Sequence, residues 1–425
     1  MLLVLALTFF IFMFLGMPVA FAILLGAMAA IWYAGDIPWM LVPSKLFLSL
    51  NSFPIMAVPF FILAGELMNA GGITARLVRL ATALVGHLRG GLAHVTVVAN
   101  IIMAGISGSA NADAAAIGSV VIPAMRRAGY PAGFTIGIVA SAATIGPIIP
   151  PSLIMIIYSS VTGMSIGSLF LAGFVPGLMV GLALMIMVAY FSHRRNYVRA
   201  SKRAPLREVL RAILDSALAL ISPVLIIGGI LSGAFTATEA GALASVYAFA
   251  AGMFYYKEIR LRDLPRLFVS ASITTAIGML IFAMCTVFGF LLARANFSAV
   301  AVDSIKMISA NPTVVWFLIM ALMVFVGMFV EAIAAMIIFI PVLTPLVNEM
   351  GYDPLHFALI FIILCLVGSL TPPVGMVLYI SCAVGRTPVS EVEIWPFVFA
   401  ILAVIVVCIF VPQLVLFIPR LFFGT

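Results

Sequence analysis

From Ala128 to Ser192 the chain contains no Asp, Glu, Lys, Arg or His. A helix that crosses a membrane needs about 20 apolar residues, so this run is long enough for more than two crossings. The rest of the chain is similar, with 65% hydrophobic and only 8% charged residues and a mean hydropathy of +1.31. A water-soluble surface requires far more charge. We therefore predict an all-α integral membrane protein, because helices satisfy their own backbone groups in lipid.

The basic residues are concentrated in one loop that follows this run. Seven of the 21 Lys and Arg residues lie there: Arg194, Arg195, Arg199, Lys202, Arg203, Arg207 and Arg211. Cytoplasmic loops carry an excess of Lys and Arg, so we predict that this loop is cytoplasmic. The net charge of +7 is then explained by the excess of basic residues in a cytoplasmic loop of a membrane protein, and we expect no nucleic-acid partner. The segment Ile73–Arg89 predicts an amphipathic helix that lies at the cytoplasmic interface.

The two halves of the chain share a repeated pattern. "RRAGYPAGF" in the first half resembles "NEMGYDPLHF" in the second, so that Gly129 matches Gly351. The same separation pairs four further sites: Gly146 with Gly368, Pro150-Pro151 with Pro372-Pro373, Ser159 with Ser381, and Gly163 with Gly385. At a slightly shorter separation, Asp113 matches Glu331. A series of matches at one separation indicates an internal duplication.

The charges around the two copies indicate opposite orientations. Basic residues flank the first copy: Arg89, Arg126 and Arg127. Mostly acidic residues flank the second: Asp303, Glu349 and Asp353, with Lys306 among them. The charge bias therefore reverses between the copies, which places the ends of the first inside and those of the second outside. Inverted-topology repeats of this kind are typical of secondary transporters.

Each copy begins with a segment that predicts a re-entrant helical hairpin. Residues 91–127 have basic residues near both ends and the polar sequence "SGSANAD" in the middle. One straight helix of this length would exceed the ~30 Å hydrocarbon core and put like charges on opposite sides. A hairpin that turns at the polar sequence avoids both problems, with Ser109, Asn111 or Asp113 as the cap of the returning helix. Residues 313–350 predict the second hairpin, with Gly327 and Glu331 at its tip.

Each hairpin precedes a span that proline interrupts. Prolines in the middle of the 132–163 and 354–386 segments prevent continuous helices there. The breaks free backbone carbonyls, which a membrane protein tolerates only where protein or a bound ion satisfies them. Carbonyl and hydroxyl oxygens coordinate a small hard cation such as Na⁺, and helix N-termini bind anions. We therefore predict two Na⁺ sites and an anion site where the hairpin tips meet the breaks.

The candidate residues follow from this arrangement. The predicted Na⁺ ligands are Ser107, Asn111, Thr144, Gly146, Gly327, Glu331, Gly368 and Thr371. The predicted substrate-binding residues are Ser107, Ser109, Asp113, Pro150, Ser152, Glu331 and Pro373. For the serines and Asn111 the alternative is close helix packing, and for Asp113 it is capping alone. In "TATEAGA", Glu239 is expected to cap the following helix.

Four motifs carry a family resemblance. "GISGSANADAAAIGSVVIPAMRRAGYP", "IGPIIPPS", "TATEAGA" and "GSLTPPVG" occur in this order, and together they resemble the large membrane subunit of TRAP (tripartite ATP-independent periplasmic) transporters. The resemblance implies an elevator-type transporter that takes up C4-dicarboxylates, sialic acids or similar carboxylates across the bacterial inner membrane, driven by Na⁺. It also implies two protein partners, a small four-helix membrane subunit and a periplasmic substrate-binding protein. The chain looks unfused, so we expect the small subunit to be a separate polypeptide in the same lipid membrane.

In that scheme the chain divides into four parts. Residues 1–90 are predicted to form scaffold spans and an amphipathic arm. Residues 91–192 form the first transport repeat, and 193–312 form the basic loop and central scaffold spans. Residues 313–425 form the second transport repeat and the last span.

Three alternatives remain open at this point. A single-component Na⁺/carboxylate symporter would share the fold but would need no binding protein. A channel would use the same helices without coupling. The "GISG" motif at Gly105–Gly108 also occurs in intramembrane serine proteases, which need a histidine base beside the serine. None of the four histidines is expected in such a place: His87, His94, His193 and His356.

Overall fold

The computed structural model describes residues 1–197, 203–309 and 311–424, and in these ranges the regular elements are helices. The prediction of an all-helical chain is therefore confirmed for the described residues, while Arg199 and Lys202 of the basic loop lie outside them. The chain begins with α1 (Leu2–Phe14), α2 (Val19–Ala34), α3 (Leu41–Leu50), α4 (Ala57–Ala70) and α5 (Ile73–Val85). Helix α5 ends at Val85, four residues before the end predicted at Arg89, because Gly86 follows it as a C-cap.

Several helices are long and apolar enough to cross a membrane. Three qualify alone in the described part of the chain: α10 (Ile166–Arg194), α14 (Leu264–Arg294, with the short turn before it) and α17 (Ala332–Glu349). Four bent pairs raise the number to as many as seven. They are α3 with α4, α11 (Leu206–Asp215) with α12 (Ala217–Leu231), α15 (Phe297–Ile308) with α16 (Pro312–Gly327), and α20 (Trp395–Phe410) with α21 (Gln413–Phe423).

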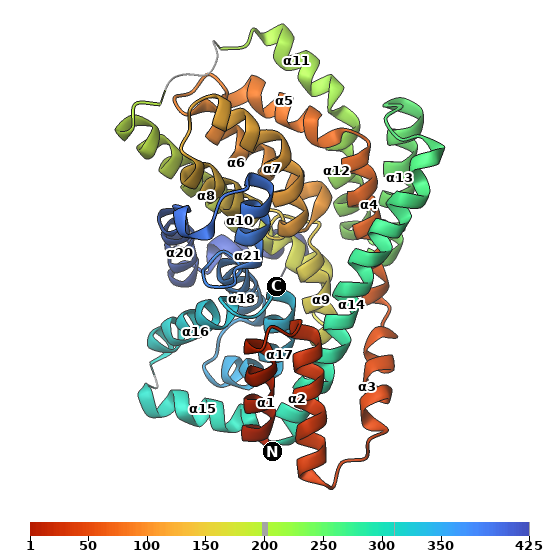
Figure 1. The fold of residues 1–425 in the computed structure, drawn as a ribbon, viewed down its shortest axis with the longest axis vertical. Helices are drawn as coiled ribbons and strands as arrows, with labels where there is room; N and C mark the ends of the chain where they lie inside the picture. Colours follow the sequence, from red (N-terminus) through yellow and green to blue (C-terminus); the bar gives the residue numbers. More distant parts are fainter. Residues whose placement is uncertain (198–202, 310, 425) are drawn as a thin grey trace.

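Two helical hairpins occupy the segments with the polar tips. Helices α6 (Gly91–Ser107) and α7 (Ala110–Arg127) pack against each other and are joined by Gly108 and Ser109. Helices α16 and α17 form the second hairpin. Figure 1 shows the first hairpin in the half of the molecule that holds α5 and α11, and the second in the half that holds α15. Both tips therefore point toward the middle of the molecule.

Two interrupted helices lie against these hairpins. The first consists of α8 (Ala132–Ala143) and α9 (Leu153–Thr162), and the second of α18 (Pro354–Gly368) and α19 (Met376–Gly385). Both breaks contain a cis peptide bond, Pro150-Pro151 in one and Pro372-Pro373 in the other. Helix α19 packs against α7 and α8, so helices from the two halves of the chain meet beside each break.

A second group of helices stands beside the hairpins. Helix α13 (Ala237–Ala250) packs along α4, and α14 contacts α2, α4 and α17. The start of α13 has a capping box, in which Thr236 accepts from the Glu239 backbone and Glu239 accepts from the Thr236 backbone. This confirms the expected capping role of Glu239. Figure 1 shows α14 as a long helix that spans most of the height of the molecule.

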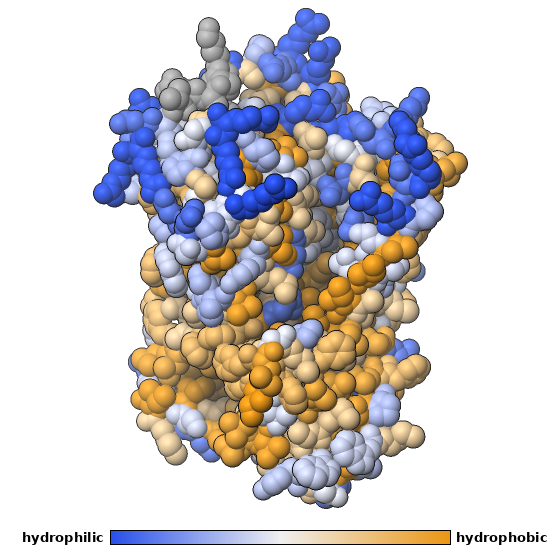
Figure 2. Space-filling model, viewed as in Figure 1, coloured by the Kyte–Doolittle hydropathy of each residue, from blue (hydrophilic) through white to orange (hydrophobic). Residues whose placement is uncertain are grey.

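The two ends of the molecule differ in charge. Figure 2 shows hydrophilic residues gathered at the end that holds α5 and α11, above a largely apolar body. Ion pairs connect segments at this end that are distant in the sequence. Arg195 lies 2.5 Å from Glu393, and Arg76 lies 3.1 Å from Glu258. The Glu393 carboxylate beside it raises the pKa of Arg195 above its usual value. The positive-inside rule predicts that the basic end is the cytoplasmic one.

The contact between the second hairpin and its break gives a stability prediction. A methyl group added at Gly327 would lie 2.6 Å from the Cα of Gly368, so Gly327→Ala has to push two backbones apart. We expect it to lower the free energy of unfolding by about 1–3 kcal/mol, measured in detergent without Na⁺. The matched control is Gly228→Ala in α12, where a methyl group meets nothing within 4 Å. Equal stability of both variants would contradict the packing described here.

Candidate functional site

The tip of the first hairpin is built by Gly108 and Ser109. Gly108 has a positive φ of 58°, and a side chain there would also strike the Pro151 carbonyl. Its own carbonyl accepts a hydrogen bond from the Leu153 backbone at 3.4 Å, which ties the tip to the start of α9. Ser109 is the N-cap of α7 and accepts from the Ala112 backbone at 3.5 Å. Of the three predicted caps, Ser109 is the one that the structure uses.

Asp113 lies one turn into α7 and is fully buried. Its Oδ1 accepts a hydrogen bond from the Ser107 hydroxyl. Its Oδ2 is buried and has no hydrogen-bond partner among the described residues. That oxygen lies against Gly146, where any Cβ would collide with it. The carboxylate is therefore directed into the break between α8 and α9, and burial without a partner is costly unless a cation or proton accompanies the charge.

The first break supplies further oxygens near this carboxylate. Among the described residues, no hydrogen bond reaches the carbonyls of Thr144 and Gly146. The Thr144 hydroxyl donates to the Ser141 carbonyl at 2.7 Å, which leaves its lone pairs free. Carbonyl and hydroxyl oxygens of this kind suit a small hard cation such as Na⁺. The Ser152 hydroxyl donates to the Pro147 carbonyl at 2.6 Å and caps α9.

The second hairpin meets its break in a similar way. The Met328 carbonyl at the tip accepts from the Val374 backbone at 3.0 Å, just as Gly108 accepts from Leu153. Gly327 and Gly368 are in direct backbone contact. Glu331 is the N-cap of α17, and its Oε2 accepts from the Ile333 backbone at 2.9 Å. Each hairpin tip is thus joined to its own break by one backbone hydrogen bond and glycine packing.

A small cavity of about 70 Å³ lies where the two hairpin tips meet. Residues at the N-termini of four half-helices line it: Ser109 of α7, Leu153 of α9, Glu331 of α17 and Met376 of α19. Asn111 also lines it, and its buried Oδ1 has no hydrogen-bond partner among the described residues. Helix N-termini carry partial positive charge. Four of them around one space, near the middle of the molecule, would favour a bound anion there.

A larger crevice of about 410 Å³ leads from the tips along α4 and α14. Ser109, Asn111 and Glu331 line its inner part, and Glu66, Asn69 and Thr274 line its outer part. A third space next to it shares Glu66 and Asn69 and is lined by Arg266 near the basic end. Figure 2 shows the molecule hollowed between the hairpin side and the ridge of α14. The crevice therefore opens toward the basic end, which is predicted to be cytoplasmic.

The structure groups most of the predicted site residues into three sets. Ser107, Asp113, Thr144 and Gly146 lie at the first tip and break, and Gly327, Gly368 and Thr371 lie at the second. Ser109, Asn111 and Glu331 line the small cavity between them. Pro150, Ser152 and Pro373 line neither that cavity nor the larger crevice. Pro150 and Ser152 lie in the first break and Pro373 in the second, and their roles as substrate contacts stay predictions.

Sequence reasoning missed Glu66, which lies in α4 on the far wall of the crevice. Its carboxylate accepts a hydrogen bond from Ser270 of α14 at 3.3 Å. The signal was present, because "FFILAGELMNAGG" contains one carboxylate within an apolar segment, and such residues are usually functional. Other lining residues of the small cavity that were not predicted, such as Leu153 and Ala332, lie next to predicted positions.

Comparison with known proteins identifies the family. The family model for the tripartite ATP-independent periplasmic transporter, DctM component, matches residues 6–414. The chain belongs to this family. The sialic acid TRAP transporter large permease protein of Vibrio cholerae is 38% identical over 97% of both chains. The C4-dicarboxylate TRAP transporter large permease protein of Pseudomonas aeruginosa is 36% identical over 88% of both chains.

The fold of this TRAP large permease also has a solved relative. The YdaH transporter of Alcanivorax borkumensis superimposes with a TM-score of 0.52 over 86% of this chain and 84% of that one, at 14% identity. Since the family consists of transporters, the chain is a membrane transport protein and not an enzyme. The protease alternative fails on geometry as well, because the Ser107 hydroxyl donates to Asp113 and not to a histidine. The family name describes a tripartite system in which this chain is the large permease.

The direction of the crevice gives a labelling prediction. A cysteine at Thr274, which lines the crevice and is exposed, should react with a membrane-impermeant maleimide in inside-out vesicles and not in right-side-out vesicles. Asp303→Cys in α15, at the other end, should react only in right-side-out vesicles. The four native cysteines are buried and provide the background measurement. Labelling of Thr274→Cys from the outer face alone would show that the crevice opens in the opposite direction.

Proposed function

We propose that this TRAP large permease performs Na⁺-driven uptake of a carboxylate-bearing solute across the bacterial inner membrane. The single observation that carries the proposal is the cavity at which four half-helix N-termini and both hairpin tips converge. Two relatives are named for sialic acid and C4-dicarboxylates, which are both carboxylate anions. A small anion bound among helix N-termini fits that chemistry.

The carboxylates at the two hairpin tips explain why a cation would be coupled to the anion. Asp113 and Glu331 lie at the starts of α7 and α17, where their negative charge opposes that of an incoming carboxylate. Na⁺ bound at each tip and break would neutralise this charge and restore the attraction of the helix N-termini. Ion and solute would then strengthen each other's binding by the same factor.

The arrangement of the hairpins supports elevator-type alternating access. The hairpins come from opposite halves of the molecule, and the arm helices α5 and α15 lie at opposite ends (Figure 1). In the proposed mechanism the hairpins and interrupted helices move together as a transport unit against α4, α13 and α14. The crevice along α4 and α14 would be the inward-open access path. The two hairpin repeats would form the inverted pair that makes both access states possible.

The system is proposed to need two partners. A periplasmic binding protein would deliver the solute to the outer end, and a small four-helix permease would extend the scaffold within the lipid bilayer. The alternative is a single-component Na⁺/carboxylate symporter of the same fold, which the binding protein would not affect.

Reconstituted transport tests this proposal. The chain is placed in proteoliposomes with the small membrane protein encoded beside it, and uptake of labelled sialic acid and succinate is measured. The proposal predicts uptake only with both an inward Na⁺ gradient and the neighbouring binding protein. Uptake with Na⁺ but without any effect of the binding protein would favour the single-component symporter. Uptake that ignores the Na⁺ gradient would contradict the proposed coupling.

Two substitutions test the assigned ion sites. Asn111→Ala and Thr371→Ala each remove an oxygen donor, so we expect the Na⁺ concentration for half-maximal uptake to rise about 10-fold, which corresponds to roughly 1.4 kcal/mol. Asn348→Ala and Thr344→Ala are matched controls on α17, because the Thr344 hydroxyl bonds the carbonyl four residues earlier, as that of Thr371 does. Wild-type Na⁺ dependence in both site variants would remove these residues from the ion sites.

A further inference from the structure

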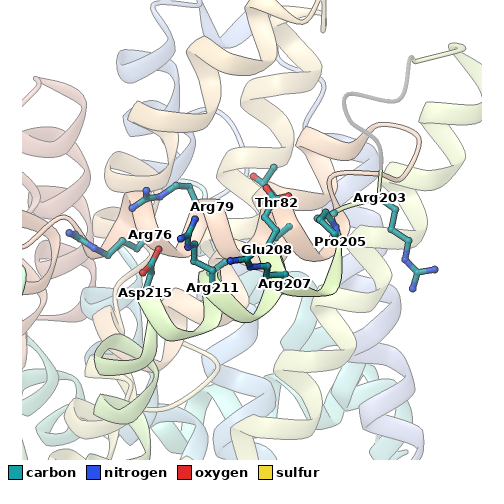
Figure 3. Close-up of a pocket in the computed structure, with 12 residues that line it drawn as sticks. Arg76, Arg79, Thr82, Arg203, Pro205, Arg207, Glu208, Arg211 and Asp215 are labelled. Atoms are coloured by element: carbon teal, nitrogen blue, oxygen red, sulfur yellow. The ribbon is translucent and has the colours of Figure 1, made fainter.

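The basic end of the molecule carries a cavity that the transport mechanism does not use. It measures about 910 Å³ and lies between α5 and α11. Five arginines and two carboxylates line it, namely Arg76, Arg79, Arg203, Arg207, Arg211, Glu208 and Asp215. Figure 3 shows Arg79 of α5 near Arg211 of α11, with Arg207 further along α11, while Arg76 and Arg203 extend outward on opposite sides.

Apart from Arg76, these arginines have no carboxylate partner within the described ranges. Arg76 is already occupied, because it donates to the Gly72 carbonyl at 2.9 Å, pairs with Glu258 and stacks on Tyr256. No ion pair holds Arg79, Arg207 or Arg211. All three side chains are exposed. Like charges around one space repel each other, and an anion between them would reverse the sign of that interaction.

Helix α11 shows which kind of anion fits. Leu206, Leu210 and Leu214 are spaced by four residues along one face, and their exposed fractions are 73%, 51% and 69%. None of the residues of α11 is buried. Helical spacing puts Arg207 and Arg211 next to this leucine stripe, on the side of α11 that lines the cavity. An apolar face beside a basic one is the pattern of a helix that lies in the membrane interface.

We propose that an anionic phospholipid of the cytoplasmic leaflet binds here, with its phosphate among Arg79, Arg207 and Arg211 and its acyl chains along the leucine face of α11. Guanidinium groups bind phosphate oxygens in bidentate fashion. A free phosphate ion would satisfy the arginines but would leave the leucine face bare in water. A lipid pairs its phosphate with the arginines and covers the leucines with its acyl chains. It would thereby hold α5 and α11 at the membrane surface while the hairpins move.

The test compares lipid binding to the purified full-length chain and three triple variants. Phosphatidylglycerol, phosphatidylethanolamine and inorganic phosphate are each titrated into delipidated protein, and bound lipid is counted by native mass spectrometry. The wild-type chain should bind phosphatidylglycerol more tightly than phosphatidylethanolamine. R79Q/R207Q/R211Q should weaken phosphatidylglycerol binding on the order of 100-fold, from about a factor of five for each basic residue near the surface.

Two further variants separate the contribution of the cavity arginines from that of the acyl chains, and an unfolding measurement checks that the variants fold. R127Q/R260Q/R262Q removes three arginines at the same end that do not line the cavity, and it should bind as the wild type does. L206S/L210S/L214S should keep any phosphate binding and lose the preference for phosphatidylglycerol over phosphate. The unfolding temperature without lipid should be equal for all variants, because the replaced side chains are exposed.

Three results would overturn the proposal. Equal phosphatidylglycerol affinity of the cavity variant and its control would show that lipid binds elsewhere. Full competition by inorganic phosphate at the affinity of the lipid would identify a site for free anions. Loss of phosphatidylglycerol binding when the small permease is co-purified would make this surface a protein interface. Each measurement is independent of transport, so the proposed function can fail without affecting this one.

Discussion

Helix ends in the middle of a membrane protein leave backbone groups without partners, and lipid supplies none. This chain has several such ends, at the tips of two hairpins and in the breaks of two spans. Each tip is placed against a break, where the Leu153 backbone donates to Gly108 and the Val374 backbone donates to Met328. These contacts require glycine, since backbones touch at Gly327 and Gly368. The close fit of tip to break is the feature on which the rest of the site depends.

The same fit creates the chemistry of the site. Bringing four half-helix N-termini to one cavity concentrates positive partial charge there. The hairpins also bring Asp113 and Glu331 to these N-termini, one with an unpartnered oxygen and the other bonded to the backbone of α17. In the proposed mechanism, a site with both features would bind an anion and a cation together better than either one alone.

Much of this arrangement follows from the sequence, for physical reasons. Proline pairs inside apolar segments and a polar cluster between basic residues have few solutions in a membrane, so hairpins and broken spans could be predicted at the right places. The exact hydrogen-bond partners could not be predicted from the sequence. Ser109 was one of three possible caps, and the bond from Ser107 to Asp113 depends on tertiary packing that brings Gly146 against the same carboxylate. Glu66 was missed because it belongs to α4, and only the fold shows that α4 faces the hairpins.

The central claim is that the tip and break contacts hold Na⁺. The most direct test is the unfolding temperature of the purified chain, measured against Na⁺ concentration with K⁺ replacing Na⁺ at constant ionic strength. An ion that binds the folded state stabilises it by about 2.7 kcal/mol per site at 100 times its dissociation constant. The account predicts a rise with Na⁺ that K⁺ does not produce and that Asp113→Asn reduces. The same response to Na⁺ and K⁺, in the wild type and in Asp113→Asn, would contradict it.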